Sequence, residues 1–167
     1  MDSNPSLAGL LARDFLSANL ASIFVSPFIN IIDKSVIRNA NGSVPLEQGI
    51  KIGLKEWFTT PRTFYLRYEF ALIKLVYTST YTSANFTDTL CAAYGISPVF
   101  PKLFATTLAN MSTSIFKDRE YTRMFGVIAK SPFPPLSYAC FFVRDVITMG
   151  FCFSLPSIVA KEINRKY

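Results

Sequence analysis

The sequence predicts an all-α integral membrane protein, with about four transmembrane helices and an amphipathic surface helix. Hydrophobic residues make up 50% of the chain and charged residues only 17%, whereas a soluble domain usually carries about 25% charged residues. The apolar residues also gather in four long segments that contain few ions. At 167 residues the chain is expected to form a single membrane domain, 1–167.

The first two apolar segments are each long enough to cross a bilayer. Residues 15–32 read FLSANLASIFVSPFINII, eighteen residues without a charge, which is about the minimum for a spanning helix. Pro27 should kink this helix. Residues 70–96 contain only Lys74 and Asp88, and their separation of fourteen residues places both ions on one helix face.

The third and fourth segments complete the predicted bundle. Residues 102–116 are rich in Ser, Thr, Ala and Asn, and residues 141–156 read FFVRDVITMGFCFSLP. Lys and Arg concentrate in the two long loops, so both termini are expected on the opposite side of the membrane from those loops. The predicted membrane helices cover about 10–32, 65–93, 102–122 and 136–160.

The first long loop contains a predicted surface helix. Residues 44–58 read VPLEQGIKIGLKEWF and place Leu46, Ile50 and Leu54 at helical spacing, with charges elsewhere. This pattern is typical of an amphipathic helix that lies on a membrane surface. A helix packed against the loop side of the protein would show the same pattern, so the sequence leaves both positions open.

Two segments of the chain share a pattern, which indicates an internal duplication. Residues 30–42 read NIIDKSVIRNANG and residues 114–126 read SIFKDREYTRMFG; each ends in a glycine, and the two glycines are 84 residues apart. Each segment has two apolar residues, an adjacent acid and base, and a further basic residue. Membrane transport proteins often contain such repeats. The predicted repeat units are about 10–93 and 98–160.

A repeated transmembrane hairpin with a surface helix resembles the mitochondrial carrier family. The resemblance rests on SPFINIIDK, where Asp33 and Lys34 follow a proline, on GIKIGLKEWF, and on RYEFALIK at the start of the second span. It implies two carrier-like helix-loop-helix units in the mitochondrial inner membrane. The chain departs from the carrier pattern at Ile29 and Ile32, which stand where carriers place charges, and it has room for four helices where carriers have six.

Charges inside or at the ends of the spans are the candidate functional residues. The deep charges are Lys74, Asp88, Arg144 and Asp145. They are expected in structural ion pairs, because intramembrane ions are usually buried against protein, and Asp88 is the expected intrachain partner of Arg144. The charges at span ends are Asp33, Lys34, Lys117 and Asp118. These are interpreted either as hydrated interface charges or as the ion pairs of a gate. Neighbouring helical residues point about 100° apart, so each acid and base should find its partner on another helix.

Several functions are excluded by composition. The chain has no histidine and no Cys, Asp or Glu cluster with metal-ligand spacing, so neither an enzyme nor a metal or other cofactor is expected. Its three cysteines show no CxxC spacing and are interpreted as reduced packing residues. The net charge of +6 is dispersed along the chain, which argues against nucleic-acid binding. The acidic N-terminus lacks the basic region of a cleavable signal peptide.

Three interpretations of function remain. The first is a non-enzymatic accessory or structural subunit of a larger mitochondrial inner-membrane complex, which the missing carrier signature favours. The second is a transporter of an anionic metabolite that works as an oligomer and binds its solute through Lys74 and Arg144. The third, a membrane enzyme, is disfavoured by the absence of histidine. Expected partners are the lipid bilayer, other membrane subunits and anionic lipid head groups.

Overall fold

Every regular element in the described part of the chain is helical. The computed structural model describes residues 6–125, 135–156, 159–160 and 163. The helices are α1 (Leu7–Ala40), α2 (Leu46–Thr59), α3 (Pro61–Tyr65), α4 (Tyr68–Tyr94), α5 (Val99–Phe125) and α6 (Pro135–Met149). A π-helical turn, η1 (Gly150–Ser154), continues α6. The predicted all-α fold class is confirmed for these residues.

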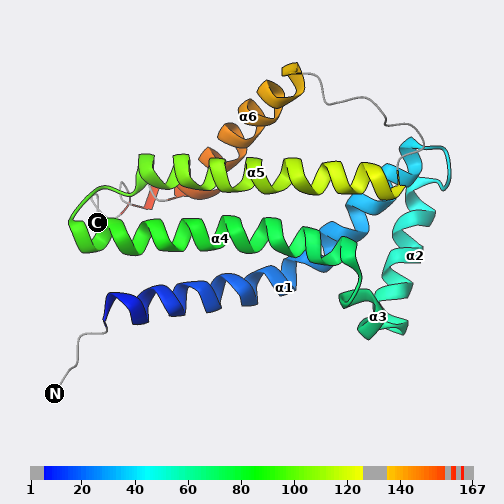
Figure 1. Cartoon of the computed structure of the whole chain (residues 1–167), viewed down its shortest axis with the longest axis horizontal. Coiled ribbons are helices and arrows are strands. Elements are labelled where there is room, and N and C mark those ends of the chain that lie inside the picture. Colours follow the sequence, from blue (N-terminus) through cyan, green and yellow to red (C-terminus); the bar gives the residue numbers. More distant parts are fainter. Residues whose placement is uncertain (1–5, 126–134, 157–158, 161–162, 164–167) are drawn as a thin grey trace.

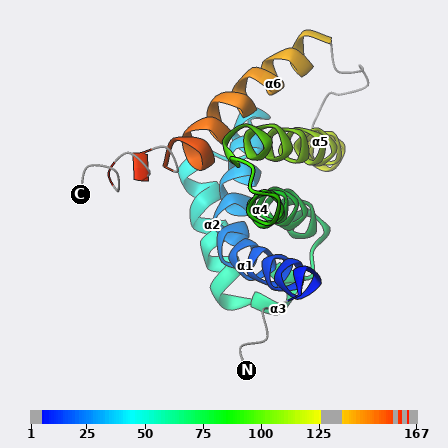
Figure 2. The same ribbon diagram turned by 90° about the vertical axis from the view of Figure 1, so that its left-hand side faces the viewer.

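Three long helices form the body of the molecule (Figure 1). α4 packs between α1 and α5, and α5 also packs against α6. α1 and α5 run in the same direction, and α4 runs in the opposite one. Figure 2 shows α1, α4 and α5 in a row, with α6 beside α5 at the end of that row. α2 and α3 lie across the end of the bundle where α1 finishes and α4 begins.

α1 is long and apolar enough to cross a membrane. It begins at a capping serine, since the Ser6 hydroxyl accepts a hydrogen bond of 3.2 Å from the Gly9 amide. Pro27 is buried inside α1, and the helix changes direction along its length (Figure 1), as expected where proline removes a backbone donor. Among the helices of the described residues, α1 alone combines sufficient length with high mean hydropathy, 1.7.

Large apolar side chains are exposed at several places on the long helices, while small polar side chains on the same helices are buried. Phe24 of α1 and Phe104 of α5 are 73% and 71% exposed, whereas Ser22 and Thr106 on the same helices are fully buried. In a water-soluble bundle the opposite distribution is normal. A hydrocarbon environment accounts for both observations. That α4, α5 and α6 cross the membrane stays a prediction.

Two glycines let α2 lie directly against α1. Gly49 and Gly53 are one helical turn apart, and a β-carbon at Gly53 would stand 2.7 Å from Cγ2 of Ile31, which is too close for contact. The buried cluster at this contact consists of Ile31, Phe64 and Phe70, with Ile50 and Trp57 packed against it. The predicted helix over 44–58 is therefore confirmed, and one of its faces contacts the protein. Its location at a membrane surface stays a prediction.

The predicted spans correspond to observed helices with different ends. The first continues to Ala40, eight residues beyond the predicted end at 32, because its charged residues find partners on other helices. The fourth corresponds to α6 with η1. The single membrane domain and the repeat units over 10–93 and 98–160 stay predictions. Gly126, which ends the second repeated segment, lies outside the described residues.

Candidate functional site

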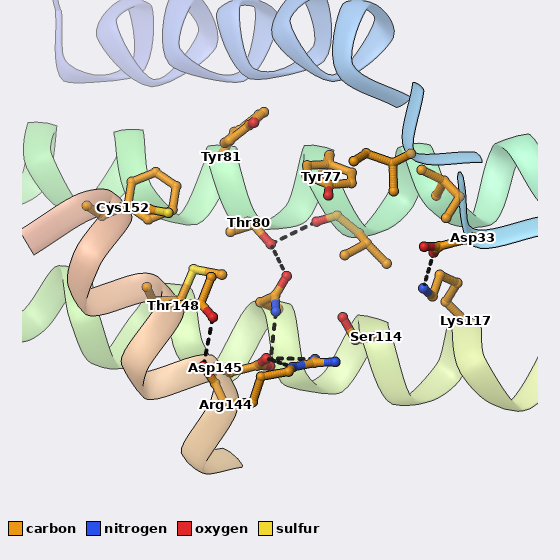
Figure 3. Close-up of a pocket in the computed structure, with 16 residues that line it drawn as sticks. Asp33, Tyr77, Thr80, Tyr81, Ser114, Lys117, Arg144, Asp145, Thr148 and Cys152 are labelled. Atoms are coloured by element: carbon orange, nitrogen blue, oxygen red, sulfur yellow. Dashed lines mark hydrogen bonds and ion pairs between the residues drawn. The ribbon is translucent and has the colours of Figure 1, made fainter. Parts of the chain in front are cut away.

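A cavity of about 450 Å³ lies between α1, α4, α5 and the continuous helix formed by α6 and η1 (Figure 3). Each helix lines it with one face. On α5 the lining residues Asn110, Ser114 and Lys117 follow helical spacing of i, i+4 and i+7. Two acids and two bases line the cavity, namely Asp33, Lys117, Arg144 and Asp145. Their formal charges sum to zero.

One end of the cavity holds a lysine between two carboxylates. The Nζ atom of Lys117 on α5 lies 2.7 Å from Oδ2 of Asp33 on α1 and 2.9 Å from Oδ1 of Asp118. The same ammonium lies 5.5 Å from the ring centre of Tyr121, within cation–π range. The Lys117 side chain is 16% exposed, so bulk water screens these contacts little. The pair of Asp33 and Lys117 links α1 to α5 directly.

Arg144 and Asp145 of α6 form the second ion pair of the cavity. Nη2 and Nε of Arg144 lie 2.7 and 2.8 Å from the same oxygen, Oδ1 of Asp145. Oδ2 of Asp145 accepts a hydrogen bond of 3.0 Å from Asn110, and Oδ1 of Asn110 accepts one of 3.2 Å from the Thr80 hydroxyl. α4 and α5 thereby fix the carboxylate, and the carboxylate holds the guanidinium at the cavity wall.

The two residues of this second pair differ in exposure. The Asp145 side chain is 1% exposed, whereas the Arg144 side chain is 50% exposed. A buried carboxylate needs both its hydrogen bonds and its cation to remain charged. Asp145 is therefore a supporting group, and Arg144 is the group that a molecule in the cavity would meet.

The wall between the two ion pairs contains both polar and apolar side chains. Figure 3 shows Ser114 between the pairs, with Thr80, Tyr77 and Tyr81 on the facing helix α4. Apolar lining is supplied by residues such as Ile73 and Val76. Such a cavity suits a small molecule that carries both charges and a polar, uncharged group. Among the described residues, no cluster of His, Cys, Asp or Glu could hold a metal ion.

Four of the eight charged residues singled out from the sequence line the cavity, and the other two deep charges do not. Lys74 lies between α4 and α1, where it donates a hydrogen bond of 3.2 Å to Oδ1 of Asn19. Asp88 lies near the end of α4 and pairs with Lys102 in the first turn of α5, at 2.6 Å. The expected pair of Arg144 with Asp88 is wrong, because the turn between α4 and α5 brings a closer cation to Asp88.

The expectation that adjacent acid and base point to different helices holds only in part. Asp33 reaches α5, whereas Lys34 reaches Glu69 of α4 at 3.1 Å. For Arg144 and Asp145 the expectation is wrong, since the long arginine side chain folds back onto its neighbour. Rigid helix geometry fixes where the Cβ atoms point, but it does not fix where a flexible four-bond side chain ends.

Lys34 belongs to a second group of charges outside the cavity, which we call the end network: Lys34, Glu56, Arg67 and Glu69. Lys34 lies 3.8 Å from Glu56 and 3.1 Å from Glu69. Arg67 contacts Glu56 and lies 3.7 Å from Glu69. The network joins α1, α2 and the start of α4. Sequence reasoning placed Lys34 at a span end but found none of its partners.

The uncharged polar residues of the cavity were also missed. Thr80 and Asn110 lie in the stretches TSTYTSAN and ATTLANMSTS, whose small residues are equally typical of close helix packing. A signal was present, because Asn110, Ser114 and Lys117 share one helix face. Polar residues that share one helix face with a charged residue indicate that this face lines a polar cavity inside the protein.

Comparison with known proteins identifies the family. The family model described as "Probable citrulline exporter" matches residues 17–167, and the chain therefore belongs to this family. Neither curated proteins nor solved structures yield a match. The interpretation as a mitochondrial carrier is wrong, since the matching family is a different one. A helical hairpin with a surface helix is a general membrane motif, and the departures at Ile29 and Ile32 are consistent with this correction. Membership of a family of probable exporters implies a membrane protein and favours a role in transport.

Proposed function

Because the chain belongs to a family of probable exporters, we propose that the protein transports a small zwitterionic amino acid with an uncharged polar tail. The family description makes citrulline the first candidate. The observation that carries the proposal is the presence of both signs of charge at two places in the cavity wall: Asp33 with Lys117, and Asp145 with Arg144. A zwitterion offers one charge of each sign to such a wall and adds no net charge to the site.

Arg144 is the proposed binding group for the solute carboxylate. A guanidinium presents its donors in a planar fork that fits a carboxylate, and its attraction is strong where water is scarce. Asp145 and Asn110 hold the guanidinium at the cavity wall. Because Asp145 is buried and already carries two hydrogen-bonding partners, a solute carboxylate does not compete with it for room.

The uncharged tail of the solute is proposed to lie along the polar wall. The hydroxyl of Ser114 and the phenol of Tyr77 both line the cavity, and each can donate and accept hydrogen bonds. A ureido group, which has both donors and acceptors, complements such groups. The cavity volume of about 450 Å³ falls within the range of roughly 300–1,000 Å³ found for small-molecule sites.

This proposal replaces the anionic metabolite expected from the sequence. Lys74 donates to Asn19 instead of lining the cavity. The carboxylates of Asp33, Asp118 and Asp145 face two cations, Lys117 and Arg144, so a solute with a net negative charge would add to an excess of negative charge. Oligomeric assembly and a place in the mitochondrial inner membrane stay predictions. The role of accessory subunit in a larger complex has no specific support from the family.

Uptake by proteoliposomes tests the proposed function. The purified full chain in liposomes loaded with citrulline should exchange radiolabelled citrulline saturably and above empty vesicles. Arg144→Lys should lower the ratio of maximal rate to half-saturation concentration about tenfold or more, since lysine lacks the fork. Arg123→Lys is the matched control, because Arg123 is an exposed residue that pairs with Glu120 on the surface of α5. Absence of exchange with the wild-type chain, or equal loss in both variants, would contradict the proposal.

A further inference from the structure

Lys117 has one partner on another helix and two on its own. Asp33 belongs to α1, whereas Asp118 and the ring of Tyr121 belong to α5, as Lys117 does. If the contact with Asp33 is lost, Lys117 keeps a carboxylate at 2.9 Å and an aromatic ring. The change needs only a small rotation of a flexible side chain, so the ammonium can be moved without being left unpaired.

Tyr121 gives the lysine a fixed support during such a movement. The residue is 1% exposed. Its hydroxyl lies 2.6 Å from Oδ1 of Asn30 on α1 and 3.1 Å from the carbonyl oxygen of Glu69 on α4. These bonds hold the ring in place whichever carboxylate Lys117 contacts.

The charges around Lys117 leave room for a second cation. Asp33, Lys117 and Asp118 together carry one net negative charge. A solute ammonium at Asp33 would give each carboxylate its own cation, with Lys117 on Asp118 and the solute on Asp33. Asp33 lines the cavity and its side chain is 29% exposed, so it can be reached from the cavity.

The contact between Asp33 and Lys117 is one of the side-chain connections between α1 and α5, beside the hydrogen bond from Tyr121 to Asn30. α4 lies between α1 and α5 over much of the bundle, as Figure 2 shows. Within the described residues, the pair of Asp33 and Lys117 is the salt bridge that joins α1 to α5. Opening it therefore removes a direct connection between the two outer helices beside the cavity.

We propose that Asp33 binds the ammonium group of the solute, and that binding transfers Lys117 from Asp33 to Asp118 and so opens the salt bridge between α1 and α5. The inference rests on the proposed function and specifies it further. Asp33 is then the residue that selects solutes with a free amino group. Asp118 is a positioning residue that receives the displaced lysine.

Competition by a solute without an ammonium group tests the selection. N-acetylcitrulline keeps the carboxylate and the ureido tail but has no cationic nitrogen. It should compete with citrulline at least about tenfold more weakly than unlabelled citrulline does in the wild-type chain. In Asp33→Asn the two compounds should compete about equally, because the carboxylate that distinguishes them is gone. Equal competition in the wild-type chain overturns the inference and leaves the proposed function intact.

The role of Asp118 has a separate test. Asp118→Asn should raise the half-saturation concentration for citrulline about tenfold, because the displaced lysine loses its acceptor charge. Asp118→Glu should restore much of the affinity. An unchanged half-saturation concentration in Asp118→Asn overturns this role. Thermal unfolding of each variant shows whether a loss of transport reflects a loss of folded protein.

A distance measurement tests, without a transport assay, whether the solute opens the salt bridge between Asp33 and Lys117. Spin labels at Val36 of α1 and Arg119 of α5, both exposed, are placed in a chain whose native cysteines are replaced. Saturating citrulline should lengthen the distance between the labels in the otherwise wild-type chain, and should do so much less in Asp118→Asn. An unchanged distance in the wild-type chain overturns the inference. If wild-type vesicles fail to exchange citrulline, the proposed function fails, and the inference that rests on it fails as well.

Discussion

Two groups of charges start from adjacent residues of α1 and differ in how they are satisfied. Asp33 faces the cavity and Lys34 faces the end network, because consecutive helical residues point about 100° apart. In the end network each carboxylate contacts both cations, which gives a closed ring with no net charge. In the cavity, Lys117 is shared between two carboxylates and Arg144 is half-exposed.

This comparison separates structural charges from the proposed binding charges. In the closed ring each charged group already contacts two groups of opposite charge, so binding a ligand there would break existing contacts. A partly exposed pair at a cavity wall can exchange one partner for a ligand at a smaller cost in free energy. Charges of both kinds lie among apolar helices, so depth in an apolar segment does not distinguish them. The number of partners and the exposure of each side chain distinguish them.

The largest expected effect on stability lies in the end network. Glu69→Ala should lower the free energy of unfolding by about 3–5 kcal/mol, because Lys34 and Arg67 lose a shared carboxylate in a buried place. Thermal unfolding of the purified chain measures this. Glu47→Ala is the control, since the Glu47 side chain is 80% exposed and its change should stay below about 1 kcal/mol. Similar shifts for the two variants would show that the ring is not structural.

A smaller effect is expected where α2 meets α1, beside the network. Gly53→Ala should destabilise by about 1–3 kcal/mol, because the new methyl group would stand 2.7 Å from the buried Ile31 side chain. Gly9→Ala is the matched control, since the nearest atom to its methyl group would be 3.4 Å away. The control should be neutral or slightly stabilising, as alanine favours helix. Denaturation of both variants side by side checks the ranking.

In the cavity we expect function to change more than stability. Asn110→Ala removes one hydrogen bond from Asp145, which should cost about 1–3 kcal/mol of stability. The half-saturation concentration for citrulline should rise, because the support of Arg144 is weakened. Ser112→Ala on the exposed face of α5 serves as comparison and should alter neither quantity. If Asn110→Ala lowers the unfolding temperature but leaves the half-saturation concentration for citrulline unchanged, the hydrogen bond from Asn110 to Asp145 has a structural role only.

The smallest effect is expected at the exposed pair on α2. Lys51→Gln breaks a contact of 2.6 Å with Glu47, and the Lys51 side chain is 72% exposed. An exposed pair at i, i+4 spacing contributes about 0.3–0.5 kcal/mol. Neither the unfolding temperature nor citrulline exchange should change measurably. A clear loss of exchange would indicate that α2 has a role beyond packing.

The sequence predicted the helices well and the binding charges in part. Arg144 and Asp145 stood out because a charge in an apolar run is costly without a partner. The partner of Arg144 was not predictable, since it depends on the reach of a flexible side chain and on which cation lies nearest to Asp88. Thr80 and Asn110 escaped notice because small polar residues serve packing and binding equally well.

The repeated pattern of the sequence has a counterpart in the contacts. The described parts of the two similar segments contact each other at two places: Asp33 contacts Lys117, and the Asn41 side chain donates to the carbonyl of Phe125. Both pairs are 84 residues apart, the same spacing as the two glycines of the pattern. Equivalent positions of two parallel helices therefore meet. Which side chains fill the space between the helices could not be read from the pattern.

A structure of the full chain with bound citrulline would show where the solute binds. We expect the solute to lie in the cavity between α1, α4, α5 and α6. Its carboxylate should be within hydrogen-bonding distance of Arg144 and its ammonium group at Asp33, with Lys117 on Asp118. Citrulline bound elsewhere, or bound in the cavity with its carboxylate away from Arg144, would contradict this expectation.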